Sequence, residues 1–367
     1  MSDDRFDVAI VGAGIAGVTL AERLAQHHQR VLLVERESQP GTHSSGRSAA
    51  MFMESYGSPQ GRALTRASRA SYAAPAIVPV LAPRGALYVA WQGQETLLEA
   101  MQAPGLVALD ARAALERVPV LRAAGLLGAW YEADAMDIDV HALLQSSLVH
   151  ARSAGAQLWT AAELSRAQRD GGDWTLTMAD GRQARAAVLV DAAGAWADVM
   201  AERCGIAGVQ LQPRRRSAFT FDAPAGIDTR DWPATCGVDE SWYFKPDAGR
   251  LLGSPANADP VPPHDVLPEA LDIASGIAQI EEHTTLGIRR PRSTWAGLRS
   301  FVPDGEMVIG FDGSEGFFWL AGHGGWGIQS AAGAAMLAES LISGMPLPEA
   351  LLREGVAPAA VSPARLR

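Results

Sequence analysis

The N-terminal stretch FDVAIVGAGIAGVTLAERLAQHHQRVLLVE constrains the fold of this chain more than any other. The apolar run Val8–Val11 predicts a short buried strand, and a glycine-rich turn follows it directly. Ala21, Leu24 and Ala25 then continue a helical stripe, and VLLVE predicts a second strand that ends at Glu35. The order of strand, tight turn, helix and strand predicts a βαβ unit and therefore an α/β protein.

The turn in this unit has the pattern G-x-G-x-x-G, formed by Gly12, Gly14 and Gly17. Gly12 permits the tight turn, Gly14 lets the backbone approach a pyrophosphate, and Gly17 lets the helix pack closely on the sheet. The N-terminus of the helix offers N–H groups to the phosphates. Glu35 can accept hydrogen bonds from both ribose hydroxyls and disfavours a 2′-phosphate, so we expect NAD or FAD.

Two further glycine-rich turns favour FAD over NAD. After the second strand the chain enters an irregular segment, GTHSSGRS, where an NAD protein usually continues with regular βα units. Val188–Val190 predicts a strand that leads into Ala193 and Gly194, and Phe317–Ala321 predicts another that leads into the run GHGGWG. Three glycine turns spread along the chain indicate one large cofactor touched by several segments, and we expect non-covalent FAD.

The composition narrows the possible binding partners and cellular location of this protein. Asp and Glu outnumber Lys and Arg by 41 to 31, and the formal net charge of -10 argues against nucleic acid or an anionic membrane as a partner. Cys204 and Cys236 lie far apart, in neither a disulfide framework nor a metal-ligand spacing. No apolar stretch approaches the roughly 20 residues of a spanning helix, and the N-terminus is not a secretory signal. We therefore expect a cytoplasmic protein without a metal site.

The glycine turns stand among further stretches that carry a resemblance, including THSSGRSAA, DAAGAWAD, AGHGGWGIQ and LGIRRPRSTWAGLRSFVPDG. Together they resemble the D-amino-acid-oxidase-like family of FAD-dependent oxidoreductases, and more closely the bacterial D-amino-acid dehydrogenases of the D-arginine dehydrogenase type. The resemblance covers nearly the whole chain. It implies a Rossmann-like FAD-binding domain from residues 1–79, 141–206 and 298–367, with an inserted substrate-binding domain, residues 80–140 and 207–297, on a mostly antiparallel sheet.

The resemblance also implies which residues bind FAD. They belong to the three glycine turns and the segments that follow them: Gly12, Gly14, Ile15, Ala16, Gly17, Glu35, Arg36, His43, Ser44, Ser45, Arg47, Ser48, Ala49, Ala193, Gly194, Trp196, Gly324, Gly325, Trp326, Gly327, Ile328 and Gln329. The last helix is expected to point its N-terminus at the flavin ring, where its dipole stabilises negative charge.

The reaction implied is oxidation of a D-amino acid by hydride transfer from Cα to flavin N5, after which water hydrolyses the imino acid to a 2-oxo acid and ammonia. Arg216 and Arg299 match the family's carboxylate clamp, a role suited to guanidinium groups. A structural salt bridge is the alternative for each. Tyr243 is expected to assist the carboxylate and Tyr56 to lie on a mobile loop over the substrate, while the backbone at Gly325 faces the substrate amine.

Five residues are expected to surround the substrate side chain: Met51, Met53, Ala86, Ala234 and Cys236. Relatives that act on basic D-amino acids have polar residues at the first two positions and a glutamate at the third. A guanidinium would meet no carboxylate here, and burying it unpaired would cost several kcal/mol, roughly. We therefore expect an apolar or aromatic substrate side chain. The alternative is that both methionines only fill the core.

Other functions remain open from the sequence. The same fold could oxidise a secondary amine, such as an N-methyl amino acid or D-proline, or a 2-hydroxy acid. A flavin-bound assembly subunit without activity is a more remote alternative, and two inward-facing arginines argue against it. The sequence does not decide whether the electrons pass to O₂, a quinone or another acceptor.

Overall fold

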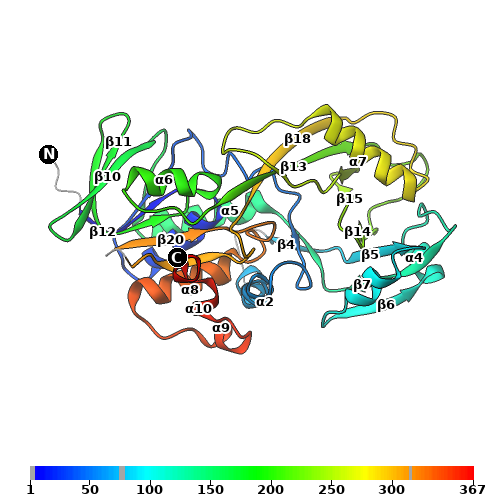
Figure 1. Cartoon of the computed structure of the whole chain (residues 1–367), viewed down its shortest axis with the longest axis horizontal. Coiled ribbons are helices and arrows are strands. Elements are labelled where there is room, and N and C mark those ends of the chain that lie inside the picture. The colour runs from blue at the N-terminus through cyan, green and yellow to red at the C-terminus, as the bar shows by residue number, and fades with distance from the viewer. Residues whose placement is uncertain (1–4, 74–78, 314–315) are drawn as a thin grey trace.

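The computed structural model describes residues 5–73, 79–313 and 316–367, and two β-sheets dominate it (Figure 1). One sheet has eight strands and the other nine, and a small three-stranded sheet accompanies them. The small sheet consists of β3 (Met51–Phe52), β4 (Leu81–Pro83) and β8 (Met136–Ile138). The two large sheets lie in different halves of an elongated molecule.

The eight-stranded sheet has a parallel centre. Its strands are β1 (Arg5–Val11), β2 (Val31–Val34), β9 (Gln157–Trp159), β10 (Leu164–Asp170), β11 (Asp173–Met178), β12 (Gln183–Asp191), β19 (Val308–Phe311) and β20 (Phe317–Ala321). The order is β10-β11-β12-β1-β2-β9, and β20 pairs with β12 and β19. The pairs β12–β1, β1–β2, β2–β9 and β12–β20 are parallel. The carboxyl ends of β1, β2, β12 and β20 therefore meet at one edge.

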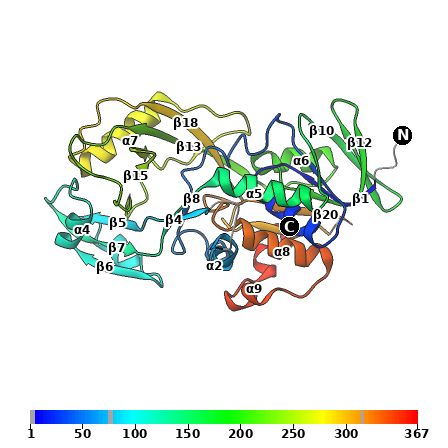
Figure 2. The same ribbon diagram turned by 180° about the vertical axis from the view of Figure 1, so that it is seen from behind.

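Helices cover both faces of this sheet, which explains why its central strands are almost wholly apolar. Val8 and Ile10 pack toward α1 (Ile15–Gln26), α5 (Val140–Ser153) and α8 (Ala331–Ser343), and Figure 2 shows α5 and α8 along the same side. Ala9 packs on the opposite face, toward α6 (Ala197–Arg203). Asp139 caps the N-terminus of α5, since its carboxylate accepts the Ala142 N–H at 2.8 Å. The remaining helices of this half are α2 (Pro59–Ala73), α9 (Glu349–Arg353), α10 (Pro358–Val361) and the short 3-10 turns η1 (Gly194–Trp196) and η2 (Pro363–Leu366).

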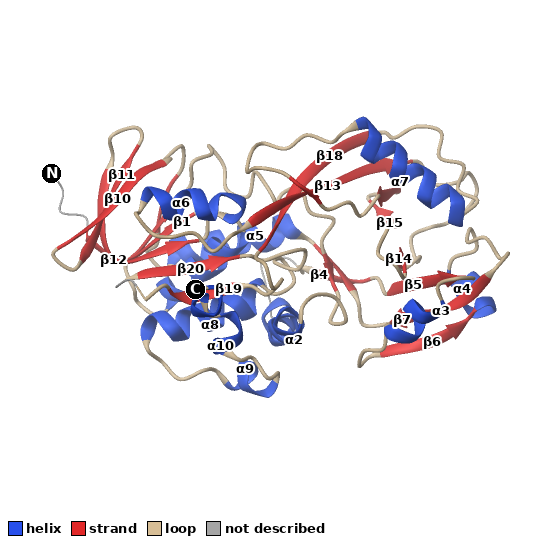
Figure 3. Cartoon of the chain, viewed as in Figure 1, coloured by secondary structure: helices blue, strands red, loops and turns tan. Residues whose placement is uncertain are grey.

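The nine-stranded sheet is antiparallel except for the pair β14–β5 (Figure 3). Its strands are β5 (Ala86–Trp91), β6 (Leu106–Asp110), β7 (Leu126–Glu132), β13 (Gln212–Phe221), β14 (Ala234–Gly237), β15 (Tyr243–Asp247), β16 (Arg250–Ser254), β17 (Asp259–Pro260) and β18 (Ser293–Phe301). The helices α3 (Glu95–Ala100), α4 (Ala111–Arg117) and α7 (Ala270–His283) accompany it. Ile273 and Ile280 of α7 are buried with Phe219 and Leu251 in the core of this half.

The long strands β13 and β18 extend from the second sheet toward the first (Figure 1). They pair without interruption from Gln212 opposite Phe301 to Thr220 opposite Ser293. The predicted α/β fold, with a Rossmann-like sheet and a mostly antiparallel second sheet, is confirmed. The proposed domain boundaries stay a prediction. Within the described ranges, no helix has both the length and the apolar character needed to cross a bilayer.

Candidate active site

A deep cavity connects the carboxyl edge of the parallel strands with the face of β13 and β18. Most residues predicted to bind FAD line it: Gly12, Gly14, Ile15, Ala16, Glu35, Arg36, His43, Ser44, Ser45, Arg47, Ser48, Ala49, Ala193, Gly194, Trp196, Gly324, Gly325, Gly327, Ile328 and Gln329. Of the residues predicted to meet the substrate, it is lined by Met51, Met53, Tyr56, Arg216, Ala234, Cys236, Tyr243 and Arg299. One continuous space thus brings together segments from the whole length of the chain.

The three glycines of the first turn have different surroundings. Gly12 has a φ of +107°, and a Cβ there would lie 2.3 Å from the Ala192 carbonyl oxygen. A Cβ on Gly17 would lie 2.0 Å from the Gly12 carbonyl oxygen, so the protein's own packing requires glycine at both positions. At Gly14 the nearest atom to a Cβ would be Ser45 Oγ, at an ordinary 3.4 Å. The open space at Gly14 faces the cavity and fits the close approach of a ligand.

Hydrogen bonds hold the groups that would face the ADP half of a dinucleotide. The Glu35 carboxylate accepts the N–H groups of Ala13 and Glu37, both at 2.9 Å, at the end of β2. Ser45 Oγ accepts the Ile15 N–H at 3.0 Å and so fastens the GTHSSGRS segment to the start of α1. The α1 N-terminus and this carboxylate on one cavity wall fit an adenosine diphosphate group.

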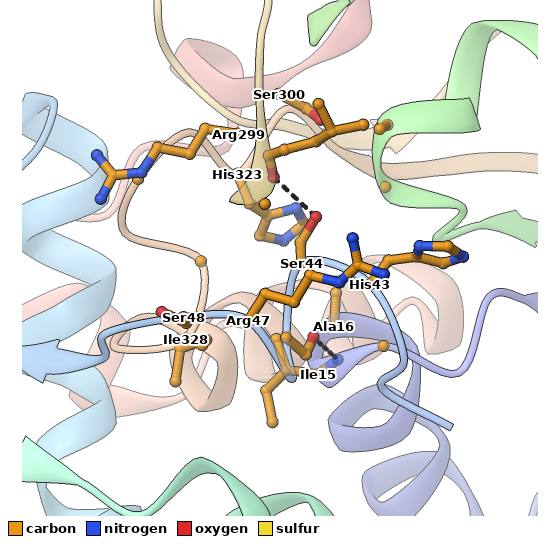
Figure 4. A pocket seen from close by; sticks show the side chains of 18 of the residues that line it. Ile15, Ala16, His43, Ser44, Arg47, Ser48, Arg299, Ser300, His323 and Ile328 are labelled. Atoms are coloured by element: carbon orange, nitrogen blue, oxygen red, sulfur yellow. Dashed lines mark hydrogen bonds between the residues drawn. The ribbon is translucent and has the colours of Figure 1, made fainter. Parts of the chain in front are cut away.

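The side chains of Arg36, His43 and Arg47 lie along the same wall. Arg36 stacks on Trp196 with 4.1 Å from its guanidinium carbon to the ring centre, and the His43 ring lies 4.7 Å from that of Trp196. Arg47 donates to the Val266 carbonyl at 3.0 Å. Figure 4 shows Arg299 pointing away from Arg47 and His43, toward the other end of the cavity. Arg47 therefore ties the cofactor-side loop to the Pro-rich segment that follows β17.

Arg216 of β13 and Arg299 of β18 define that other end. Arg299 pairs across the strands with Arg214, which is two residues from Arg216, so Arg216 and Arg299 project from the same face. Arg216 Nε donates to the Asn257 carbonyl at 2.6 Å, and Arg299 Nη1 donates to the Tyr56 hydroxyl at 3.1 Å. Within the described part of the chain, neither guanidinium pairs with a carboxylate.

The neighbouring Arg215 shows the contrast. It points to the opposite face, where its Nε lies 2.9 Å from Asp272 Oδ2 and its Nη1 contacts Glu269.

Burial, with the adjacent Arg299 charge, lowers the pKa of Arg216 to about 10. Burial opposes the charge on Arg299, but the facing tyrosine hydroxyls raise its pKa above the ordinary value. Both inward arginines are thus cationic at neutral pH, and the pair attracts an anion.

The third glycine turn closes over this arginine pair. A Cβ on Gly325 would lie 2.7 Å from Arg299 Nη1 and 2.9 Å from the Tyr56 hydroxyl, so a larger residue there would displace the ends of these two side chains. Gly324 N–H donates to the Ser300 carbonyl at 2.8 Å and fastens the turn to β18. The structure therefore brings the segments of Tyr56, Arg299 and Gly325 into contact.

Three residues that were predicted to contact the cofactor or the substrate lie behind the cavity wall and do not line it. Ala86 is fully buried among Met53 and Tyr88, because β5 directs its side chain into the interior. Trp326 packs edge-on against Tyr56 with 5.9 Å between ring centres. Gly17 lies beneath the first turn, where it serves helix packing and has no surface on the cavity.

Gln329 does line the cavity, but its amide serves the chain itself. Its Oε1 accepts the Met53 N–H at 3.2 Å, and its Nε2 donates to the Met53 and Tyr56 carbonyls and to Thr65 Oγ1. We therefore assign this side chain to holding the Met53–Tyr56 loop.

Sequence reasoning missed several lining residues, namely Tyr88, Trp242, Lys245, Glu240 and His323. The sequence predicted no carboxylate around the substrate side chain, whereas Glu240 lines the same cavity from the hairpin turn between β14 and β15. Tyr88 could have been found, since the stretch ALYVAW is typical of a strand, in which Tyr88 shares a face with Ala86. Burial lowers the pKa of His323 to about 4, so its ring is neutral at pH 7.

The fold and the cavity together define a dinucleotide-binding protein with an anion-attracting pocket at the far end of its cofactor site. Residues 7–341 match the DAO family, described as FAD dependent oxidoreductase. The chain belongs to this family, it is an FAD-dependent oxidoreductase, and the residues along the cavity fit its cofactor.

Individual relatives agree with this assignment. The glycine oxidase of Geobacillus kaustophilus (strain HTA426) is 25% identical over 363 residues, which cover 92% of this chain and 93% of the relative. Its crystal structure has a TM-score of 0.82, 23% identity and 98% coverage of both chains. The L-proline dehydrogenase from P. horikoshii has a TM-score of 0.82 at 18% identity, with 99% of this chain and 98% of that chain covered. The L-alpha-glycerophosphate oxidase of Mycoplasma pneumoniae, with FAD bound, has a TM-score of 0.83 at 16% identity and coverage of 93% and 95%.

Proposed function

We propose that this protein oxidises a D-amino acid to an imino acid, which water then hydrolyses to a 2-oxo acid and ammonia. Bound FAD supplies the two-electron acceptor for the reaction. The observation that carries the proposal is the pair of Arg216 and Arg299, two guanidinium groups that face one cavity while no described carboxylate pairs with them. A substrate carboxylate supplies the missing anion, because each guanidinium can give it paired, charge-assisted hydrogen bonds.

The surrounding residues orient the rest of the substrate in this proposal. Tyr56 already accepts a hydrogen bond from Arg299, so its hydroxyl can turn its own proton toward the bound carboxylate. Tyr243 lines the same end and faces both arginines. The backbone of the Gly325 turn presents its carbonyl to the substrate amine, which directs the Cα–H bond toward the cofactor side. The resemblance to bacterial D-amino-acid dehydrogenases supports the D configuration.

The substrate side chain meets a wall that is mainly apolar. Met51, Met53, Ala234 and Cys236 line it, and burial raises the pKa of the Cys236 thiol to about 12, so this side chain is neutral. Methionine adapts to irregular apolar shapes. We therefore propose an apolar or aromatic side chain on the substrate.

Glu240 favours a second candidate, a long side chain that ends in a cation. Its carboxylate belongs to the exposed hairpin turn and lines the cavity, so a side chain long enough to reach it could place an ammonium or guanidinium group there. The two candidates share the reaction and differ only in the substrate.

Anaerobic mixing of the holoenzyme with D-leucine, D-phenylalanine, D-arginine and the L-isomers, followed by the flavin absorbance, tests both candidates. Reduction by D-leucine or D-phenylalanine and not by D-arginine supports the apolar pocket. Reduction by D-arginine that Glu240→Gln weakens selectively supports the second candidate. If none of these primary-amine amino acids reduces the flavin while D-proline, an N-methyl amino acid or a 2-hydroxy acid does, the proposal is wrong. Adding O₂ or a soluble quinone to the reduced enzyme then identifies the acceptor class.

A further inference from the structure

The loop that carries Tyr56 over the arginine pair, residues Met53–Tyr56, is held from two sides. On the side of the eight-stranded sheet, Gln329 binds the loop backbone at Met53 and Tyr56 with distances of 3.0 to 3.2 Å. On the other side, the partner is Glu132, the last residue of β7 in the nine-stranded sheet. The loop therefore bridges both halves of the molecule.

Within the described part of the chain, the Glu132 carboxylate accepts hydrogen bonds from two consecutive residues of this loop. Its Oε1 accepts the Glu54 N–H at 2.6 Å and the Ser55 N–H at 3.4 Å, and its Oε2 accepts the Ser55 hydroxyl at 2.5 Å. Ser55 Oγ also lies 3.0 Å from the Tyr88 hydroxyl. The carboxylate thus fixes both the backbone and the side chain of Ser55, the residue next to Tyr56.

Burying the Glu132 carboxylate in this environment costs free energy. The residue is only 4% exposed, and among the described residues no cation lies within ion-pair distance of it. The nearby Glu54 has its own partner in Arg69, at 2.6 Å. Burial raises the pKa of Glu132, although the hydrogen bonds from Ser55 and Glu54 favour its ionised form. A buried carboxylate is tolerated here because the loop supplies its donors.

The strand pairing explains how the interior accommodates this carboxylate. Glu132 stands directly opposite Ala86 in the antiparallel pair β5–β7. Side chains of such partners have Cβ atoms about 5 Å apart on one face of the sheet. The methyl group of Ala86 leaves room for the longer side chain of Glu132, which reaches past it to the loop.

We propose that Glu132 is a positioning residue for substrate binding. It fixes Ser55, and Ser55 in turn fixes Tyr56, whose hydroxyl meets Arg299 where the proposed substrate carboxylate binds. The ring of Tyr56 is supported at the same time by Trp326. This inference rests on the proposed function, because it assigns substrate affinity to the contact between Tyr56 and Arg299.

The test compares Glu132→Ala and Glu132→Gln holoenzymes with the wild type. Hydrogen exchange followed by mass spectrometry measures protection of the Glu54 and Ser55 amides, and anaerobic reduction with D-leucine measures the dissociation constant and the limiting rate of reduction. Glu132→Ala should exchange these amides faster and raise the dissociation constant about tenfold, with the limiting rate changed by less than roughly threefold. Glu132→Gln retains one acceptor oxygen and should restore most of the affinity.

Two further variants separate positioning from general stability. Glu339→Gln is the matched control, because Glu339 is also a buried carboxylate (6% exposed) but bonds to Arg23, away from the cavity. It should leave both the exchange of the loop and the substrate affinity unchanged. Ser55→Ala removes the hydroxyl that Glu132 binds, and it carries the test if Glu132→Ala does not fold.

Unchanged amide protection in Glu132→Ala overturns the proposal, and so does faster exchange with unchanged substrate affinity. Equal losses of affinity in Glu132→Ala and Glu339→Gln also overturn it, because the effect would then be general destabilisation. If none of D-leucine, D-phenylalanine and D-arginine reduces the wild-type enzyme, the proposed function is at fault, and the exchange comparison still decides whether Glu132 holds the loop.

Discussion

Replacing Arg299 with methionine separates binding from folding at the arginine pair. The guanidinium of Arg299 has the Tyr56 hydroxyl as a partner and no described carboxylate, so its remaining donors are available to a substrate. Two charge-assisted hydrogen bonds to a substrate carboxylate are worth about 1.5–3 kcal/mol each, or roughly 3–6 kcal/mol together. We therefore expect Arg299→Met to lower kcat/KM for the best D-amino acid by roughly 10²- to 10⁴-fold.

The free energy of unfolding should respond to Arg299→Met far less than kcat/KM does. Arg299 and Arg216 are like charges that face one cavity, and burial together with the Arg299 charge lowers the pKa of Arg216. Methionine removes one of these charges and keeps an apolar side chain of similar length. The variant also loses the hydrogen bond to the Tyr56 hydroxyl, so the two effects oppose each other and the thermal midpoint of the substrate-free holoenzyme should change little. Steady-state kinetics and thermal unfolding followed by circular dichroism give the two quantities.

Arg215→Met is the matched control. This arginine lies on the same strand but pairs with Asp272 and Glu269 on the other face, and it is only 9% exposed. Its loss takes the cationic partner from the half-buried Asp272 carboxylate and should reduce the free energy of unfolding by about 1–3 kcal/mol, with substrate affinity nearly unchanged. A fall in kcat/KM of less than about tenfold for Arg299→Met, or an equal fall for both variants, would refute the assignment of Arg299 to the substrate.

Three other predictions concern the cofactor turn, pH and the pocket. Gly14→Ala should fold but lose FAD affinity, because its Cβ enters the cavity. Gly12→Ala should fail to fold, because its Cβ would lie 2.3 Å from a carbonyl oxygen. Flavin absorbance measures the bound FAD, and circular dichroism shows whether each variant folds. Burial lowers the pKa of His323 from 6.5 to about 4, so the free energy of unfolding should fall by about 3 kcal/mol as the pH falls from 6.5 to 4. Urea unfolding at several pH values measures this fall, and it should be smaller in His323→Asn. Ala86→Glu should not create D-arginine oxidation in the flavin-reduction assay; it should lower stability by a few kcal/mol, roughly, because it places a second buried carboxylate opposite Glu132.

Local sequence patterns were sufficient to predict the secondary structure around the cofactor turn. The strand before Gly12, the helix after it and the strand ending at Glu35 are encoded by residues adjacent in the chain, so their periodicity alone predicted them. The glycines could be assigned because a positive φ and a close backbone approach require glycine. The α/β class followed from the same evidence.

The substrate half depends on contacts that a single sequence does not display. Three consecutive arginines precede Ser217, and only the pairing of β13 with β18 decides that Arg216 shares a face with Arg299 while Arg215 pairs with carboxylates on the other. The hairpin turn brings Glu240 to the cavity, and the pairing of β5 with β7 places Glu132 behind Ala86.

One physical cause explains why the cofactor half was predictable from the sequence and the substrate half was not. Hydrophobic period and glycine geometry act over a few neighbouring residues, so the sequence by itself determined the fold class, the dinucleotide turn and the expectation of FAD. Strand register and burial join segments far apart in the chain, such as Ser55 and Glu132 or Tyr56 and Arg299. Only the tertiary structure could therefore decide which charges face the cavity, which are paired, and which hold the loop above them.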